Sequence, residues 1–277
     1  MTGAEAARRK AVARWRDWRR GRVASADGFS WLVAALAGLA AGLVNALAGG
    51  GSLISFPVLT ALGLSPLIAN LTNTVALTPG YLGAAWSQRR DLVGQGERIR
   101  LLVPAACLGG VLGGVLLLHS AERLFTAMVP WLILFGSSLL ALQPPLRRLM
   151  RSSAGNPRPR RLPIPLIGAV GLAAVYGGYF GAGLSVIFLA VLGLAMADSL
   201  TRLNALKQFL SFATNSCAAI VLMISGRVHW PLALIVAVAS IVGGALGGAL
   251  AHRVDAEVLR WLVVVLGVAI GFWFLFH

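Results

Sequence analysis

Acidic residues are scarce in this sequence. Only 9 of its 277 residues are Asp or Glu, and charged residues of both signs make up 12% of the chain. A soluble domain carries about twice that fraction of charge. The few carboxylates near the apolar stretches, such as Asp198, lie at their ends, so no proton relay through buried acids is indicated. These shortages argue against an ordinary soluble domain.

Cysteine is scarcer still, and Cys107 and Cys217 are the two in the chain. Both lie inside apolar runs, where a thiol behaves as a small core residue, and no zinc-type spacing occurs. The glycine-rich segments 109–114 and 243–248 lack the Lys-Ser or Lys-Thr that follows a phosphate-binding loop. The sequence therefore excludes a self-contained ATP-driven pump, and we expect neither a cofactor nor a metal.

Hydrophobic residues, in contrast, make up 58% of the chain and form long runs. A helix needs about 20 predominantly apolar residues to cross a bilayer. We therefore expect an all-α integral membrane protein with about eight transmembrane helices in two repeated four-span halves. The predicted spans are 30–62, 66–87, 99–118, 122–142, 164–194, 199–224, 231–251 and 256–276.

The charged segments divide the chain into four parts. Residues 1–29 form a basic N-terminal arm, 30–142 the first repeat, 143–163 a linker rich in Pro and Arg, and 164–277 the second repeat. Most of the 24 basic residues lie in the arm, the linker and the 89–100 loop, and positive charge marks the cytoplasmic side of a membrane protein. We therefore expect the arm, the linker and both termini on the cytoplasmic side of a bacterial inner membrane. The net charge of +15 is interpreted as topological, so no nucleic-acid partner is expected.

The first and fifth spans are too long for a single crossing. Residues 30–62 would extend about 50 Å as one continuous helix, whereas the hydrocarbon core is about 30 Å thick. Gly49–Gly51 interrupts the first of these spans and Gly181–Gly183 interrupts the fifth. Each is predicted to be either a discontinuous helix or a span followed by a re-entrant half-helix.

Short matches in the same order relate the two halves of the chain. Gly38–Ala41 matches Gly171–Ala174, Gly50 matches Gly183, Ser52 matches Ser185, Asn73 aligns with Asn204, and 109–114 matches 243–248. An even number of crossings in each half predicts a parallel repeat about an axis along the membrane normal. If the glycine break adds a true crossing, the repeat becomes inverted. The glycines four apart in 109–114 and 243–248 predict close helix packing.

Polar residues within the spans concentrate beside the two breaks and in the spans that follow them. A half-helix that begins at Ser52 or Ser185 would present free backbone N–H groups and a positive dipole end, which favour an anion. Lys207 is the one lysine of the hydrophobic region. The candidate substrate-binding residues are Asn45, Gly50, Gly51, Ser52, Asn73, Thr74, Gly183, Ser185, Asn204, Lys207, Gln208 and Asn215.

Over about residues 32–276 the chain resembles the sulfite exporter TauE/SafE family of bacterial membrane permeases. The segments that carry the resemblance are Gly49–Ser52 followed by Pro57, Asn70–Thr74, Asn204–Asn215, Ser225–Trp230 and Gly243–Gly248. The resemblance implies a secondary transporter, an exporter of small anions such as sulfite, organosulfonates or small carboxylates. The implied partners are that anion and the lipid bilayer. The sequence allows a homo-oligomer but does not decide the oligomeric state.

Two enzymatic readings compete with transport. One is an intramembrane serine hydrolase that uses Ser52 or Ser185 with His229, although every His is predicted at a span end. The other is a thiol–disulfide oxidoreductase that uses Cys107 and Cys217. We expect neither, and therefore no enzyme.

Overall fold

The computed structural model describes residues 28–152, 164–196, 198–250 and 256–276, and in these ranges it is helical with no strand. This confirms the all-α prediction. The elements are α2 Gly28–Leu47, α3 Ser52–Ala61, α4 Pro66–Ser87, the 3-10 helix η1 Arg89–Leu92, α5 Gly96–His119, α6 Glu122–Ser152, α7 Ile164–Tyr179, α8 Leu184–Ala195, α9 Leu200–Ile224, α10 Trp230–Leu250 and α11 Ala256–Phe276.

Six helices in the described part of the chain are long and apolar enough to cross a membrane: α2, α5, α6, α9, α10 and α11. Their outward faces carry exposed hydrocarbon, for example Leu108 on α5 and Leu234 on α10. In a soluble protein such faces would be unstable, whereas lipid chains cover them at no cost. The chain is therefore a multi-pass membrane protein.

The helix ends follow local sequence signals. The side chain of Ser65 caps α4 and Pro66 occupies its first turn, and Ser199 caps α9 in the same manner. The fourth predicted span differs, because α6 continues to Ser152 instead of ending at Leu142. Pro144 and Pro145 suggested an end there, but a proline removes one donor and can bend a membrane helix without terminating it.

Each glycine break folds a short helix back on the long helix before it. Gly49 and Gly50 have φ angles of 80° and 95°, which favour glycine. A Cβ placed on Gly51 would lie 2.2 Å from the carbonyl oxygen of Ala41. In a continuous helix these residues would be about 15 Å apart. The chain therefore reverses between α2 and α3, and Gly181 and Gly183, both with φ of 78°, form the corresponding break between α7 and α8.

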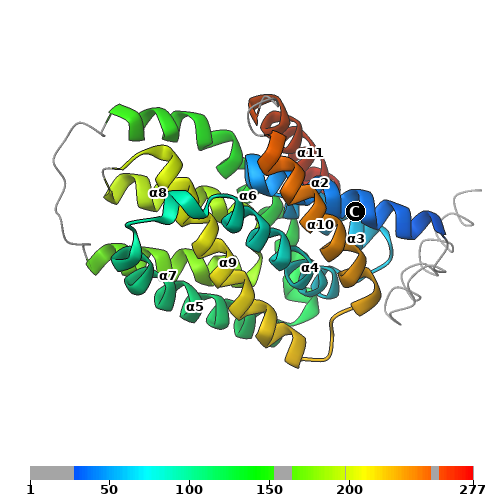
Figure 1. Cartoon of the computed structure of the whole chain (residues 1–277). Helices are drawn as coiled ribbons and strands as arrows, with labels where there is room; N and C mark the ends of the chain where they lie inside the picture. The colour runs from blue at the N-terminus through cyan, green and yellow to red at the C-terminus, as the bar shows by residue number, and fades with distance from the viewer. Residues whose placement is uncertain (1–27, 153–163, 197, 251–255, 277) are drawn as a thin grey trace, which may run out of the picture.

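Close helix pairs join the two predicted halves (Figure 1). Gly38 lies against Val236 and Gly42 against Ser240, so α2 and α10 run in the same direction. In the same way, α5 and α7 pack in parallel through the glycines of 109–114, as the spacing of these glycines predicts.

Helices at corresponding places in the two halves run in opposite directions. Ser137 of α6 faces Gly267 of α11, and Leu134 faces Gly271, so α6 and α11 are antiparallel. A parallel repeat requires corresponding helices to run the same way. The helix directions therefore contradict the predicted parallel arrangement and fit the inverted alternative. The reason is that the folded-back helices α3 and α8 give each half five segments, an odd number.

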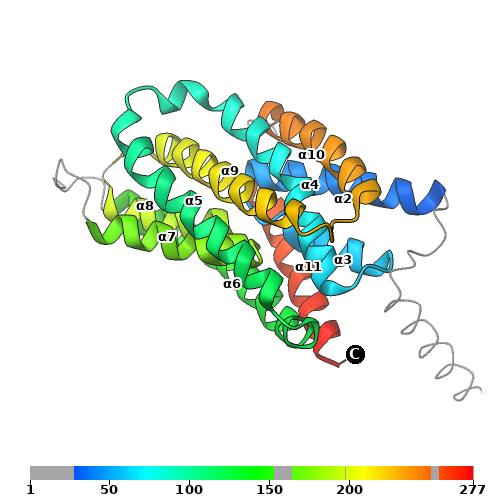
Figure 2. The ribbon, with the colours of Figure 1, turned by 90° about the horizontal axis from the view of Figure 1, so that it is seen from below.

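The ends of the bundle follow from these directions. The start of α2 lies at one end of the bundle, whereas the end of α6 and the start of α7 lie at the other (Figures 1 and 2). The end of α11 lies toward the same end as the start of α2 (Figure 2). This does not fit the predicted layout, in which the segments preceding α2 and following α6 share one side. The arm and most of the linker lie outside the described residues.

Candidate functional site

Buried polar side chains gather beside the two breaks and along α4 and α9. In a lipid-embedded protein each such group is costly, which makes the cluster a candidate site. Its members that are less than a tenth exposed are Asn45, Ser52, Ser55, Asn70, Thr72, Asn73, Thr74, Ser185, Lys207, Gln208, Ser211, Thr214 and Asn215.

The two glycine breaks touch each other. A Cβ on Gly49 would lie 2.8 Å from the Cβ of Ser185, the second residue of α8. The N-terminal ends of α3 and α8 therefore lie close together, although they belong to different predicted halves. Gly183 and Gly50 both pack against α6, at Gly136 and Leu140 respectively. Two positive helix ends thus meet inside the bundle.

The backbone donors of the first break are partly occupied. The side-chain oxygen of Asn45 accepts a hydrogen bond of 2.7 Å from the N–H of Gly51. The N–H groups of Leu53 and Ile54 donate to the carbonyls of Gly50 and Gly51. The helix end therefore offers fewer free N–H groups than the sequence led us to expect. Side chains must supply more of any ligand contact.

Helix α4 carries two predicted site residues and brings one of them, Asn73, to α3. The hydroxyl of Ser55 donates to the side-chain oxygen of Asn73 at 2.5 Å. This leaves the side-chain nitrogen of Asn73 with no partner among the described residues. The hydroxyl of Thr74 donates to the carbonyl of Asn70 within its own helix, at 3.0 Å.

Helix α9 contributes the charge. Lys207 is 1% exposed, and the neighbouring Gln208 is fully buried. The side-chain nitrogen of Gln208 donates to the carbonyl of Asn45 at 3.3 Å, which ties α9 to the first break. Asn215 is buried and donates back to Ser211 within the helix. A buried ammonium beside polar groups favours an anionic ligand.

Six polar atoms of this region have no hydrogen-bond partner among the described residues. Buried polar atoms are nearly always paired, so a group of unpaired atoms indicates where a ligand or water binds. They are Asn70 Oδ1, Asn73 Nδ2, Ser185 Oγ, Gln208 Oε1, Ser211 Oγ and Thr214 Oγ1.

Asn204 lies apart from these atoms. It is partly exposed, and its side-chain nitrogen donates to Gln88 at the end of α4 at 2.8 Å. Both residues lie at the end of the bundle where α4 ends and α9 begins. Asn204 therefore joins α9 to the end of α4 and belongs to none of the contacts around the breaks.

Asp198 is the centre of a charged cluster at the same end of the bundle. It pairs with Arg98 of α5 and with Arg202 of α9, and Arg202 also donates to the carbonyl of Val93 at 3.0 Å. Burial alone would raise the pKa of Asp198, but hydrogen bonds from Arg98, Arg202 and a backbone N–H outweigh it and lower the pKa. These contacts join the α4–α5 loop to the start of α9.

Several participants were missed in the sequence. Ser55, Asn70 and Gln143 contact predicted site residues or the breaks, and all three are buried. Asn70 belonged to the polar 70–74 segment, so a signal existed. Gln143 was assigned to the linker, where a polar residue is unremarkable. Nothing in the sequence marked Ser55, because a single serine in an apolar helix is common.

The described residues do not assemble the predicted serine hydrolase. The hydroxyl of Ser185 has no partner in the described part of the chain, so no general base activates it. His229 lies between α9 and α10, where its backbone N–H donates to Thr72 and burial lowers its pKa. Cys107 and Cys217 form no disulfide, but their thiols lie within reach of each other, as the oxidoreductase alternative requires. The described residues also contain no group of His, Cys, Asp or Glu that could hold a metal ion.

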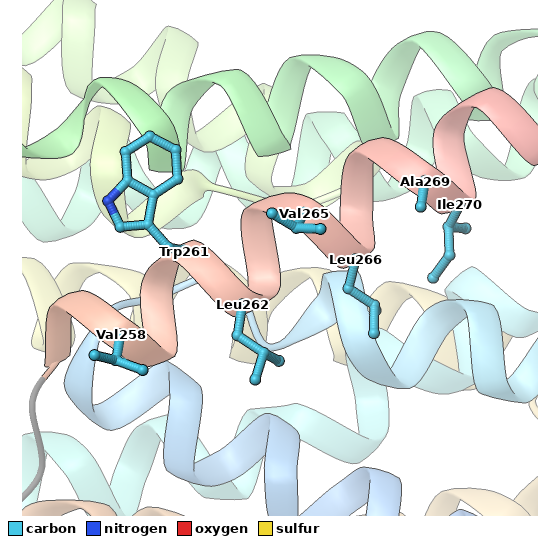
Figure 3. Close-up of a pocket in the computed structure, with 7 residues that line it drawn as sticks. All are labelled: Val258, Trp261, Leu262, Val265, Leu266, Ala269 and Ile270. Atoms are coloured by element: carbon cyan, nitrogen blue, oxygen red, sulfur yellow. The ribbon is translucent and has the colours of Figure 1, made fainter.

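A shallow apolar groove on α11 is a poor site for a polar solute. Figure 3 shows its lining, which runs along one face of the helix from Val258 to Ile270. Every lining side chain is hydrocarbon except the indole of Trp261. Such a surface suits lipid chains.

A helical membrane protein with a buried polar centre at two touching helix breaks has the general construction of a membrane transporter. The model of the sulfite exporter TauE/SafE family matches residues 34–274. The chain therefore belongs to the sulfite exporter TauE/SafE family.

Similar proteins carry transporter names. A "probable membrane transporter protein ORF9" of Sinorhizobium sp. is 26% identical over 238 residues, 85% of this chain and 88% of that protein. A "probable membrane transporter protein" of Haemophilus influenzae is 26% identical over 231 residues, which cover 83% and 88% of the two chains. The "probable membrane transporter protein YfcA" of Escherichia coli K12 is 24% identical over 226 residues, 81% and 82%. No solved structure matches this chain. Together with the family, these relatives support a membrane transporter.

Proposed function

We propose that this membrane transporter moves small anions such as sulfite or organosulfonates outward across the bacterial inner membrane, through a site between its two halves. The observation that carries the proposal is the group of unpaired polar atoms next to Lys207 and the touching breaks. Lys207 and the two helix N-termini favour negative charge. The proposed site residues are those predicted above, with Ser55, Asn70, Ser211 and Thr214 added and Asn204 left out, because its printed partner is Gln88.

A cation is the less suitable substrate. Carbonyl oxygens freed by helix breaks are the usual ligands for Na⁺ in broken-helix transporters. Here the carbonyls of Asn45, Ala48 and Tyr179 accept hydrogen bonds from Gln208, Gln143 and Asn70. The breaks therefore present few carbonyls to a cation.

An inverted repeat of five segments in each half, 30–142 and 164–277, accounts for the helix directions and suggests how transport proceeds. The axis lies in the membrane plane, near the place where α4 and α9 cross. Rocking of one half against the other about the central site would expose it to each side in turn. We propose that both termini are cytoplasmic, and that the 143–163 linker lies on the opposite side.

Flux measurements on protein reconstituted in liposomes test the proposed function. Wild type should accumulate or release sulfite, methanesulfonate or a small carboxylate, and Lys207→Gln should lower the rate at least tenfold, because the anion loses its charged partner. Arg123→Gln, a change at an exposed position at the start of α6, is the matched control and should behave as wild type. If none of these anions moves, or if both variants transport normally, the proposal fails.

A further inference from the structure

The last carbonyl groups of α2 and α7 need hydrogen-bond donors from elsewhere, because each helix ends before its own N–H groups can reach them. The last four carbonyls of any helix lack intrahelical donors. At these two breaks backbone N–H groups cap the carbonyls of Val44 and Tyr176, and a side chain of another helix caps one further carbonyl at each. In a lipid-embedded core an unpaired carbonyl would cost several kcal/mol.

The donors cross between the predicted halves. Asn70 on α4, in the first half, donates to the carbonyl of Tyr179 in the second half at 2.8 Å. Gln208 on α9, in the second half, donates to the carbonyl of Asn45 in the first half at 3.3 Å. Both amide side chains are fully buried. Each break is thus held by the half to which it does not belong.

The orientation of each amide is set by this bond. A carbonyl accepts only a donor, so the nitrogen must face it and the amide oxygen must face elsewhere. Asn70 Oδ1 and Gln208 Oε1 are both buried and have no partner among the described residues. The same side chain therefore holds a break with one atom and leaves the other for a ligand or water.

We propose that Asn70 and Gln208 are reciprocal positioning residues, each fixing the glycine break of the opposite half so that the two breaks change conformation together. This inference deepens the proposed transport function and rests on it only for its effect on transport rate. Two other caps do not cross from one half to the other: Gln143, near the end of α6, on Ala48 at 3.1 Å, and Tyr176 on Ala182 at 2.6 Å. Those caps hold a break without linking the halves.

Amide hydrogen exchange on the full chain in nanodiscs tests the cross-connection without any substrate. Asn70→Leu keeps the size of the side chain and removes the donor. It should speed exchange in 180–187, the second break, by roughly tenfold, the factor expected for one lost hydrogen bond. Exchange in 46–55, the first break, should change less. Gln208→Leu should give the opposite pattern, and Gln143→Leu should affect 46–55 alone.

Asn70→Asp separates positioning from a general loss of stability. When protonated, the acid can donate to Tyr179 as the amide does, whereas the carboxylate repels that carbonyl. Compared with wild type at the same pH, exchange in 180–187 should be closer to normal at about pH 5, where more of the acid is protonated, than at about pH 9. Transport by Asn70→Asp should likewise be more impaired at about pH 9 than at about pH 5.

The inference is overturned if Asn70→Leu loosens both breaks equally, or loosens neither, or if Asn70→Asp shows no dependence on pH. These results would leave anion transport by the wild type intact. Conversely, suppose that wild type moves no tested anion, while Asn70→Leu speeds exchange in 180–187 and Gln208→Leu speeds it in 46–55. The proposed function would then be refuted and the cross-connection supported.

Discussion

Gly49 and Ser185 lie against each other, so close that a Cβ on Gly49 would be 2.8 Å from the Cβ of Ser185. This contact joins the first break of the chain to the start of α8. It requires both the left-handed backbone of Gly49 and the absence of a side chain there. The contact makes Gly49 a sensitive position for both stability and transport.

Gly49→Ala should destabilise the protein by about 2 kcal/mol or more, since it adds strain at a positive φ to a steric clash. Thermal unfolding in detergent measures the effect as a lower Tm. Gly168→Ala is the control, because a Cβ on Gly168, in α7, meets nothing within 4 Å. That variant should be unchanged or slightly more stable. Equal Tm values for wild type and Gly49→Ala would refute the contact.

Ser185→Ala should reduce transport while leaving stability within about 0.5 kcal/mol of wild type. The hydroxyl of Ser185 has no partner among the described residues, so its removal breaks no bond within them. If it contacts the anion, the apparent KM should rise about fivefold. Ser137→Ala, in which a buried hydroxyl bonds within its own helix, should leave the KM unchanged. An unaltered KM in Ser185→Ala would remove this serine from the site.

Acid should weaken the protein through Asp198. The pKa of Asp198 is lowered in the folded state, so its contribution to stability is complete above the ordinary pKa of Asp, about 4. The contribution is lost as the pH falls below that value and through the lowered pKa. Tm measured between about pH 6 and pH 3 should therefore fall less steeply in Asp198→Asn than in wild type. Glu122→Gln, at the exposed start of α6, should keep the wild-type slope.

The helix directions predict which segments share a side of the membrane. In a Cys107→Ala, Cys217→Ala background, single cysteines at Thr2 and His277 should react with an impermeant thiol reagent from the same side. A cysteine at Asn156, in the linker, should react from the opposite side. Labelling of all three from one side would restore the parallel layout. Labelling of the termini from outside would reverse the orientation proposed here.

The same background tests the oxidoreductase alternative. Replacement of both thiols by Ala should leave anion flux within about twofold of wild type, because each cysteine acts as a small apolar residue. Loss of function with a normal Tm would instead assign the thiols a chemical role.

Local signals in the sequence predicted most of the helices. The predicted spans 66–87 and 256–276 have the bounds of α4 and α11. The positions of both breaks followed from their glycines. The direction of α3 did not, because Gly49 and Gly50 permit either a kink or a reversal. The contact of Gly51 with Ala41, a tertiary feature, decides between them.

The candidate site was predicted less completely than the fold. Polarity inside apolar spans pointed to residues such as Asn73 and Gln208, but it could not separate a ligand contact from a structural cap. Asn204 is the clearest example, since its partner Gln88 lies in a different half and only folding brings them together. The resemblance to the family implied an anionic solute, and a positive charge at the buried Lys207 would favour such a solute.

The glycine-lined pairing of α2 with α10 also governs how the chain is made. Helix α2 is the first described helix to leave the ribosome, and α10 is the last but one. Until α10 arrives, Gly38 and Gly42 of α2 have no backbone to pack against. Neither half can reach its final shape alone, so assembly in the membrane waits for nearly the whole chain, and a protein truncated before residue 230 would be left for proteolysis.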